Sequence, residues 1–172
     1  MEIKNAKEFL LKIQKEENKK KTKKDVKMSS LLLEDRKNVL NLKILVGVDV
    51  SGSISRAQFC QFMRQIDAIR GLSVVKVLET DTKVVALYNY YKTSQNQVMR
   101  LQGGGGTEFT EAFQSARSIQ PNAMLFLTDG EIEPAPIRDP GFPVGWILCH
   151  GGKKPPFSFG EVLFTLPPVH GE

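Results

Sequence analysis

The chain has 172 residues, of which 41% are apolar, and this size suits one compact domain with at most a short appendage. Two cysteines, Cys60 and Cys149, make no disulfide framework, and no apolar stretch reaches the roughly 18 residues of a membrane span or resembles a signal peptide. The net charge of +5 lies in residues 1–27, which hold ten lysines against five acidic residues, whereas residues 28–172 hold fourteen of each sign. We therefore expect a soluble cytoplasmic protein whose main body has no basic surface for nucleic acid.

The N-terminal region, residues 1–40, is predicted to be a basic helical arm and linker that precedes a main domain over residues 41–172. Helical spacing over residues 2–17 places apolar side chains near one face at Ile3, Ala6, Leu10 and Ile13. The stretch NKKKTKKDVK at 18–27 interrupts this pattern and predicts a linker over about residues 18–30. Such a run is typical of a solvated tail, although it could also contact an anionic partner, including nucleic acid.

The first strand of the main domain is ILVGV at 44–48, whose apolar residues do not alternate, as is typical of a strand covered on both faces. Ser55 and Gln58 match a capping box and predict the start of a helix that ends near Gly71. The stretches LSVVKVL at 72–78 and KVVALYNY at 83–90 flank the short turn ETDT and predict an antiparallel hairpin.

The second half of the chain repeats the alternation of helix and strand. Four glycines at 103–106 precede a helix with apolar spacing from Phe109 to Ile119. Buried strands are predicted at 123–128 and 145–149, with a further candidate at 161–166. This order predicts an α/β sandwich with a mostly parallel central sheet and one antiparallel hairpin strand.

Three loops that carry oxygen-rich side chains are expected to meet at the carboxyl edge of this sheet. They are the segment Asp49-Val-Ser-Gly-Ser53, the glycine-rich segment 103–107 that ends in Thr107, and Thr128-Asp129-Gly130. The loops offer carboxylates and hydroxyls without histidine or cysteine, a set that suits a hard cation such as Mg²⁺ and not Zn²⁺. The sequence therefore predicts a metal site.

The motif DVSGS at 49–53, together with Thr107 and the TDG at 128–130, resembles the metal-ion-dependent adhesion site of von Willebrand factor A (VWA) domains. The resemblance implies a Rossmann-like three-layer sandwich and a metal site made by Asp49, Ser51, Ser53, Thr107 and Asp129. It also implies that Mg²⁺, or Mn²⁺ or Ca²⁺ in its place, captures an acidic residue of a protein partner. A binding module of this kind is not an enzyme.

A narrower resemblance covers about residues 43–167. The segments GGGGTEF, LTDGEIEPAP and FPVGWILCHGG are similar to the VWA-like C-terminal domain of bacterial proteins that carry a metallopeptidase name. Related VWA proteins work beside MoxR-type AAA+ ATPases, which makes such an ATPase a candidate partner. The sequence has no HExxH motif, so a peptidase activity is not implied, and Glu108 stands where the family usually has Asp.

Two other functions remain open at this point. Asp49, at the end of a strand, could serve a Mg²⁺-dependent phosphatase or hydrolase, although Ser51 stands where such sites commonly have a second acid. Alternatively, the chain could be an interaction protein that works through its basic arm, with a vestigial metal site. Nucleotide binding is disfavoured because Thr-Glu follows the four glycines where a phosphate-binding loop needs Lys and then Ser or Thr.

Overall fold

A computed structural model of the chain describes residues 2–22, 42–71, 73–90 and 105–169. These residues form three helices and six strands, in the order α1 (Glu2–Thr22), β1 (Lys43–Asp49), α2 (Arg56–Arg70), β2 (Val74–Thr80), β3 (Val84–Asn89), α3 (Thr110–Ile119), β4 (Ala123–Thr128), β5 (Val144–Leu148) and β6 (Glu161–Thr165). Ser55 caps α2 as predicted: its hydroxyl accepts from the amide of Gln58, whose side chain accepts from the amide of Ser55.

The six strands form one sheet in the order β3-β2-β1-β4-β5-β6. β3 is antiparallel to β2, and every other neighbouring pair is parallel. The mostly parallel sheet with one antiparallel hairpin strand is therefore confirmed. From β1 the chain builds outward to β2 and β3 on one side, and then returns through α3 to start β4 on the other side of β1.

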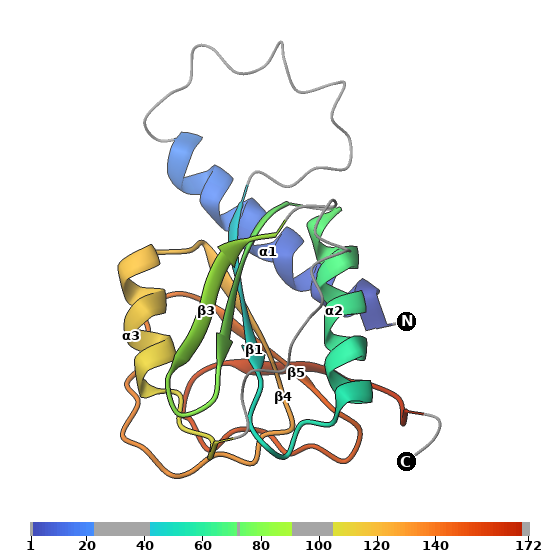
Figure 1. Cartoon of the computed structure of the whole chain (residues 1–172). Helices are drawn as coiled ribbons and strands as arrows, with labels where there is room; N and C mark the ends of the chain where they lie inside the picture. Colours follow the sequence, from blue (N-terminus) through green and yellow to red (C-terminus); the bar gives the residue numbers. More distant parts are fainter. Residues whose placement is uncertain (1, 23–41, 72, 91–104, 170–172) are drawn as a thin grey trace.

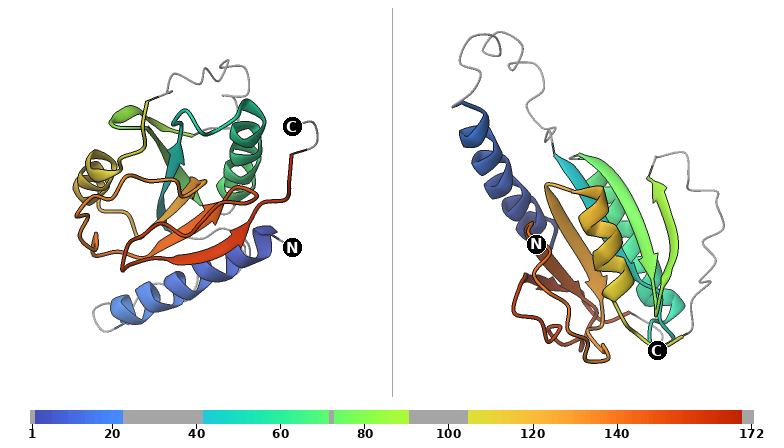
Figure 2. Two further views of the ribbon diagram at one scale, coloured as in Figure 1. Left: turned by 90° about the horizontal axis from the view of Figure 1, so that it is seen from below. Right: turned by 90° about the vertical axis from the view of Figure 1, so that its left-hand side faces the viewer.

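Helices cover both faces of the sheet, which makes the predicted three-layer sandwich. Figures 1 and 2 show α2 and α3 on opposite faces, with α1 running beside β6. One buried cluster joins α1 and α2 to the sheet and includes Leu10, Phe62 and Val46. On the opposite face, α3 packs through Phe113 into a group of aromatic rings that also holds Phe126, Trp146, Phe157 and Phe159.

β4 is buried along its whole length, and β1 is buried at every residue after Lys43, because both faces of the sheet are covered. Gly47 of β1 shows how tightly the aromatic layer fits: a Cβ atom there would lie 2.6 Å from the ring of Phe126 on β4. A residue larger than glycine would therefore displace this ring. The close approach of the Phe126 ring to β1 thus requires glycine at position 47.

The N-terminal helix differs from its prediction in length and in packing. It continues to Thr22, because lysine and glutamate are good helix formers even where the apolar spacing stops. The rest of the expected linker, residues 23–30, lies outside the described residues. Ala6, Phe9, Leu10 and Ile13 are buried in the domain, and the Asn5 side chain donates to the carbonyl of Leu163 in β6.

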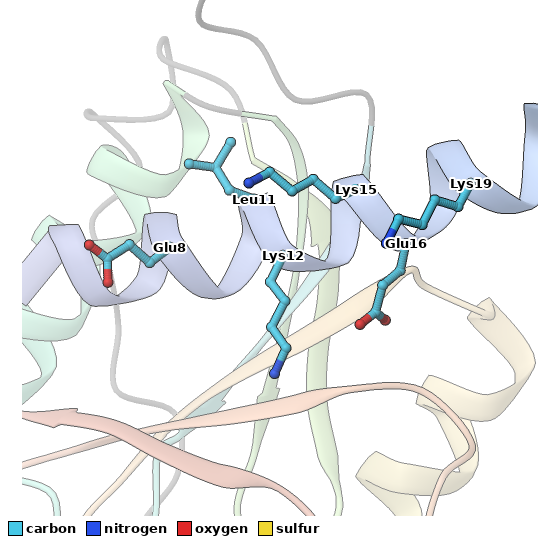
Figure 3. Close-up of a pocket in the computed structure, with 6 residues that line it drawn as sticks. All are labelled: Glu8, Leu11, Lys12, Lys15, Glu16 and Lys19. Atoms are coloured by element: carbon cyan, nitrogen blue, oxygen red, sulfur yellow. The ribbon is translucent and has the colours of Figure 1, made fainter.

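The outer face of α1 is charged. A shallow groove along it is lined by six residues of this helix: Glu8, Leu11, Lys12, Lys15, Glu16 and Lys19. Figure 3 shows Leu11 and Lys15 pointing to one side of the helix and Lys12 and Glu16 to the other. Lys12, Lys15 and Lys19 of the arm thus lie on the surface of a helix that is packed on the domain. Among the described residues, no helix combines the length and apolar character that crossing a membrane requires.

Candidate functional site

The predicted site residues lie at the carboxyl edge of the parallel strands, the lower edge in Figure 1. β1 ends at Asp49 and β4 ends at Thr128, and these two strands are neighbours in the sheet. They flank the point at which the strand order reverses, since the chain extends from β1 to one side and from β4 to the other. Open α/β sheets have a crevice at such a switch point, and ligands commonly bind there.

Asp49 is the centre of the site and is fully buried. Its Oδ1 accepts a hydrogen bond of 3.0 Å from the backbone amide of Ser51, and its Oδ2 accepts one of 2.6 Å from the hydroxyl of Thr128. The hydroxyls of Ser51 and Ser53 lie 3.1 Å apart, with Ser51 buried and Ser53 exposed. The first loop therefore presents a carboxylate and two neighbouring hydroxyls that lead from the interior to the surface.

Burial of Asp49 disfavours its charged form. It raises the pKa of this carboxyl from 3.8 to about 6, and the hydrogen bonds from Ser51 and Thr128 offset only part of that effect. The nearby carboxylate of Asp129 raises the pKa further. Within the described residues, neither Asp49 nor Asp129 takes part in an ion pair. A bound cation would supply the opposite charge that favours the ionised carboxylate.

Asp129 and Thr107 come from the other two loops. Asp129 is largely buried, and its Oδ1 accepts a hydrogen bond of 2.9 Å from the amide of Glu131. Thr107 is also largely buried, and its carbonyl accepts from the amide of Glu133 at 2.9 Å. Within the described part of the chain, the Thr107 hydroxyl has no hydrogen-bond partner, so its oxygen is available to a ligand.

Backbone hydrogen bonds connect the three loops. The amide of Gly52 donates to the carbonyl of Gly105 at 3.2 Å, which ties the DVSGS loop to the segment that leads to Thr107. The bond between Glu133 and Thr107 ties that segment to the loop after β4. The structure thus joins Asp49, Ser51 and Ser53 by direct contacts, sets the charge of Asp129 near Asp49, and brings the Thr107 segment alongside through its backbone.

Gly130 allows the loop after β4 to pack against the segment after β5. It has a positive φ of 76°, and a Cβ atom there would lie 1.7 Å from the carbonyl oxygen of Lys153. The amide of Lys153 also donates to the carbonyl of Asp129 at 2.8 Å. The glycine of TDG is therefore needed for this close approach, and the approach holds the backbone of Asp129 in place.

Two features of the site escape a reading of the sequence alone. Thr128 is the partner of Asp49, a role that its place before Asp129 does not reveal. The turn between β2 and β3 also reaches the site, because the carbonyl of Asp81 accepts a hydrogen bond of 3.0 Å from the amide of Glu108, directly after Thr107. Glu108, which departs from the family pattern, has a local role: its carboxylate accepts from the amide of Thr110 at the start of α3.

The donor set consists of two carboxylates and three hydroxyls. No group of three or more His, Cys, Asp or Glu side chains that could hold a metal occurs among the residues that the structure describes. Any ion at this edge would therefore depend on serine and threonine oxygens and on water. Cys149 is buried, whereas His150 and Cys60, which lies on α2, are exposed.

The fold and the edge together define a class of protein: a three-layer α/β domain whose polar loops gather where the strand order reverses. A family model for this class, described as VWA-like domain (DUF2201), matches residues 44–165. The chain belongs to the VWA-like domain (DUF2201) family. No curated protein matches the chain.

Proposed function

We propose that the chain is a protein-interaction module in which a divalent cation, bound by Asp49, Ser51, Ser53, Thr107 and Asp129, captures an acidic residue of a partner protein. The observation that supports this most is the burial of Asp49 beside paired serine hydroxyls, with Asp129 as its charged neighbour. Burying a carboxylate without an opposite charge is costly, and a cation at this point offsets that cost.

The oxygen donors favour Mg²⁺, with Mn²⁺ or Ca²⁺ as alternatives. In this proposal, Ser51, Ser53 and Thr107 supply neutral hydroxyl oxygens, while Asp49 and Asp129 act directly or through water. Asp49 is suited to an indirect role because both of its oxygens already accept hydrogen bonds from the protein. Its carboxylate would then hold the Ser51 amide and the Thr128 hydroxyl in place by hydrogen bonds, and its negative charge would attract the cation.

The charge of the site suggests what completes it. Asp49 and Asp129 formally balance one divalent ion, and the remaining donors are neutral. A cation bound mainly by neutral oxygens retains affinity for a further carboxylate, so an aspartate or glutamate of a partner protein is the ligand that we expect. Because similar VWA proteins work beside MoxR-type AAA+ ATPases, such an ATPase is the first partner to test.

A hydrolase that uses Asp49 as nucleophile fits the geometry less well. The carboxylate is fully buried, and its oxygens accept hydrogen bonds from the Ser51 amide of the same loop and from the Thr128 hydroxyl at the end of β4. A nucleophile must reach the reacting atom of a substrate. We therefore infer binding and not catalysis.

Metal binding is tested by calorimetric titration of Mg²⁺ and Mn²⁺ into chelator-treated protein. We expect saturable binding by the wild type and its loss in Asp49→Ala. Glu161→Gln is a matched control, since it removes one negative charge at an exposed position of β6. Absence of binding by the wild type, or equal binding by Asp49→Ala, would refute the metal site.

Partner capture is tested with the MoxR-type ATPase in Mg²⁺ and in chelator. The proposal requires capture in Mg²⁺ that Asp49→Ala abolishes. The contribution of the arm is tested by Lys12→Glu with Lys15→Glu, which alters its exposed face (Figure 3). Truncating the arm is less informative, because α1 buries Phe9, Leu10 and Ile13. Loss of capture in the lysine variant alone would favour a function of the arm.

A further inference from the structure

We propose that Asp81, in the turn between β2 and β3, is a positioning residue that sets the Thr107 segment against the DVSGS loop. This inference rests on the proposed metal-binding function and adds a fourth loop to the site. From the sequence, Asp81 is an ordinary turn residue. The structure gives Asp81 contacts to Gly105 and Glu108, on either side of Thr107, and Gly105 in turn bonds to the DVSGS loop.

Within the turn, Asp81 is largely buried and fixes the backbone around it. Its Oδ1 accepts hydrogen bonds from the amides of Thr82 and Lys83, at 2.5 and 3.2 Å. The amide of Asp81 donates to the carbonyl of Lys83 at 3.2 Å, and the hydroxyl of Thr80 donates to the same carbonyl at 3.0 Å. An aspartate that accepts from the following amides restricts a turn to one conformation.

Outside the turn, the carbonyl of Asp81 faces the segment that carries Thr107. It accepts a hydrogen bond of 3.0 Å from the amide of Glu108, the residue directly after Thr107. The other carboxylate oxygen, Oδ2, lies against Gly105, where a Cβ atom would be only 3.3 Å from it. The turn therefore contacts the Thr107 segment on both sides of the proposed ligand.

The end of β2, directly before the turn, contacts the first loop. The carbonyl of Thr80 accepts from the amide of Val50, which lies between Asp49 and Ser51, and the carbonyl of Gly105 accepts from Gly52. The turn therefore contacts the Thr107 segment directly, and it reaches the DVSGS loop through that segment and through the end of β2, which is paired with β1. A shift of the turn would change the separation between the Thr107 hydroxyl and the serine hydroxyls.

Such a shift matters because Mg²⁺ demands near-ideal octahedral geometry, with oxygens at about 2.0–2.1 Å. Mutating a group that orients metal ligands without touching the ion typically lowers the affinity of the site for the metal by about 10- to 100-fold. A positioning role and a direct role of the Asp81 carboxylate predict different behaviour for asparagine. Asparagine keeps the Oδ1 acceptor and hence the turn, but it removes the charge.

The experiment compares Asp81→Ala, Asp81→Asn and Asp139→Ala in the full chain. Asp139 is a matched control, since its Oδ1 also accepts a backbone amide in a turn, that of Gly141. Mn²⁺ affinity is measured by titration, and hydrogen exchange of the Glu108 amide is measured in metal-free protein. We expect Asp81→Ala to weaken Mn²⁺ binding about tenfold and to speed exchange at Glu108. Asp81→Asn and Asp139→Ala should stay within about threefold of the wild type in both measurements.

The inference is overturned if Asp81→Ala leaves both measurements unchanged. It is also overturned if Asp81→Asn binds Mn²⁺ as weakly as Asp81→Ala while Glu108 remains protected, since the charge and not the turn would then matter. If the wild type binds no metal, the proposed function fails, and Glu108 exchange still decides whether Asp81 positions the segment. If circular dichroism shows that Asp81→Ala has not folded, Gly105→Ala replaces it, because its Cβ crowds the Oδ2 of Asp81. This variant should also weaken Mn²⁺ binding and speed Glu108 exchange, and no change in either measurement would overturn the inference.

Discussion

Replacing Asp49 with asparagine is expected to stabilise the metal-free protein at neutral pH while it abolishes metal binding. The pKa of Asp49 is raised from 3.8 to about 6, so folding favours the protonated acid. The contribution of this group to stability is therefore complete below about pH 4 and is lost as the pH rises through 6. At pH 7 the folded state has lost about 3 kcal/mol of stability, because each unit by which the folded pKa exceeds the unfolded pKa corresponds to 1.36 kcal/mol.

Asparagine is neutral at every pH and avoids this loss, at a small cost in hydrogen bonding. Its Oδ1 can accept from the Ser51 amide as before, but its Nδ2 would meet the Thr128 hydroxyl, which now donates to Asp49. This mismatch costs about 1 kcal/mol. The net expectation is a free energy of unfolding about 2 kcal/mol higher than that of the wild type at pH 7, and no higher at pH 4.

The assay is urea unfolding with chelator at both pH values, repeated in Mg²⁺ at pH 7. A ligand at 100 times its dissociation constant stabilises a protein by about 2.7 kcal/mol, so Mg²⁺ should remove the advantage of Asp49→Asn by stabilising the wild type alone. A variant that is less stable than the wild type at pH 7 in chelator would refute the reasoning from burial. Asp139→Asn, an exposed aspartate, should change stability little at either pH.

Three further changes test the scaffold of the site. Gly130→Ala should destabilise the protein by more than about 3 kcal/mol in thermal unfolding, because its Cβ would overlap the Lys153 carbonyl, whereas Gly151→Ala, with φ of 74° and no atom within 4 Å of a Cβ, should cost only about 1 kcal/mol. Equal effects of the two substitutions would contradict the close approach. Ser55→Ala should cost about 1 kcal/mol in urea unfolding through loss of the α2 cap and leave Mn²⁺ affinity unchanged, which a titration checks. Phe113→Ala should cost about 3–5 kcal/mol in the same unfolding assay, since the ring is fully buried among other aromatic rings; a cost below 1 kcal/mol would argue against this core.

Local sequence signals predicted much of the fold because they act within a few residues. The capping box at Ser55 and Gln58 fixes the start of α2, and the unbroken apolar runs of β1 and β4 correctly predict strands covered on both faces. The gathering of the loops at one edge follows from the parallel arrangement, so their proximity could also be predicted. The individual metal ligands stay a prediction.

Features that depend on contacts between distant residues could not be predicted in this way. The continuation of α1 to Thr22 is different, since it is a local feature that apolar spacing alone does not predict: helix propensity does not require an apolar face. Thr128 meets Asp49 across 79 residues, and Asp81 meets Glu108 through backbone atoms that any sequence would offer. Nothing in the local pattern distinguishes these residues from ordinary strand-end and turn residues.

The contact between β1 and β4 also determines when the site can exist. Asp49 and Thr128 meet only after the chain has brought together segments 79 residues apart, and closing so long a loop is one of the costly steps in folding. A nascent chain that has not yet produced β4 holds Asp49 without its hydroxyl partner or Asp129. A ligand that binds only the completed site stabilises the native state and not the unfolded chain. Occupancy of this edge would therefore favour only those chains in which β4 already lies beside β1.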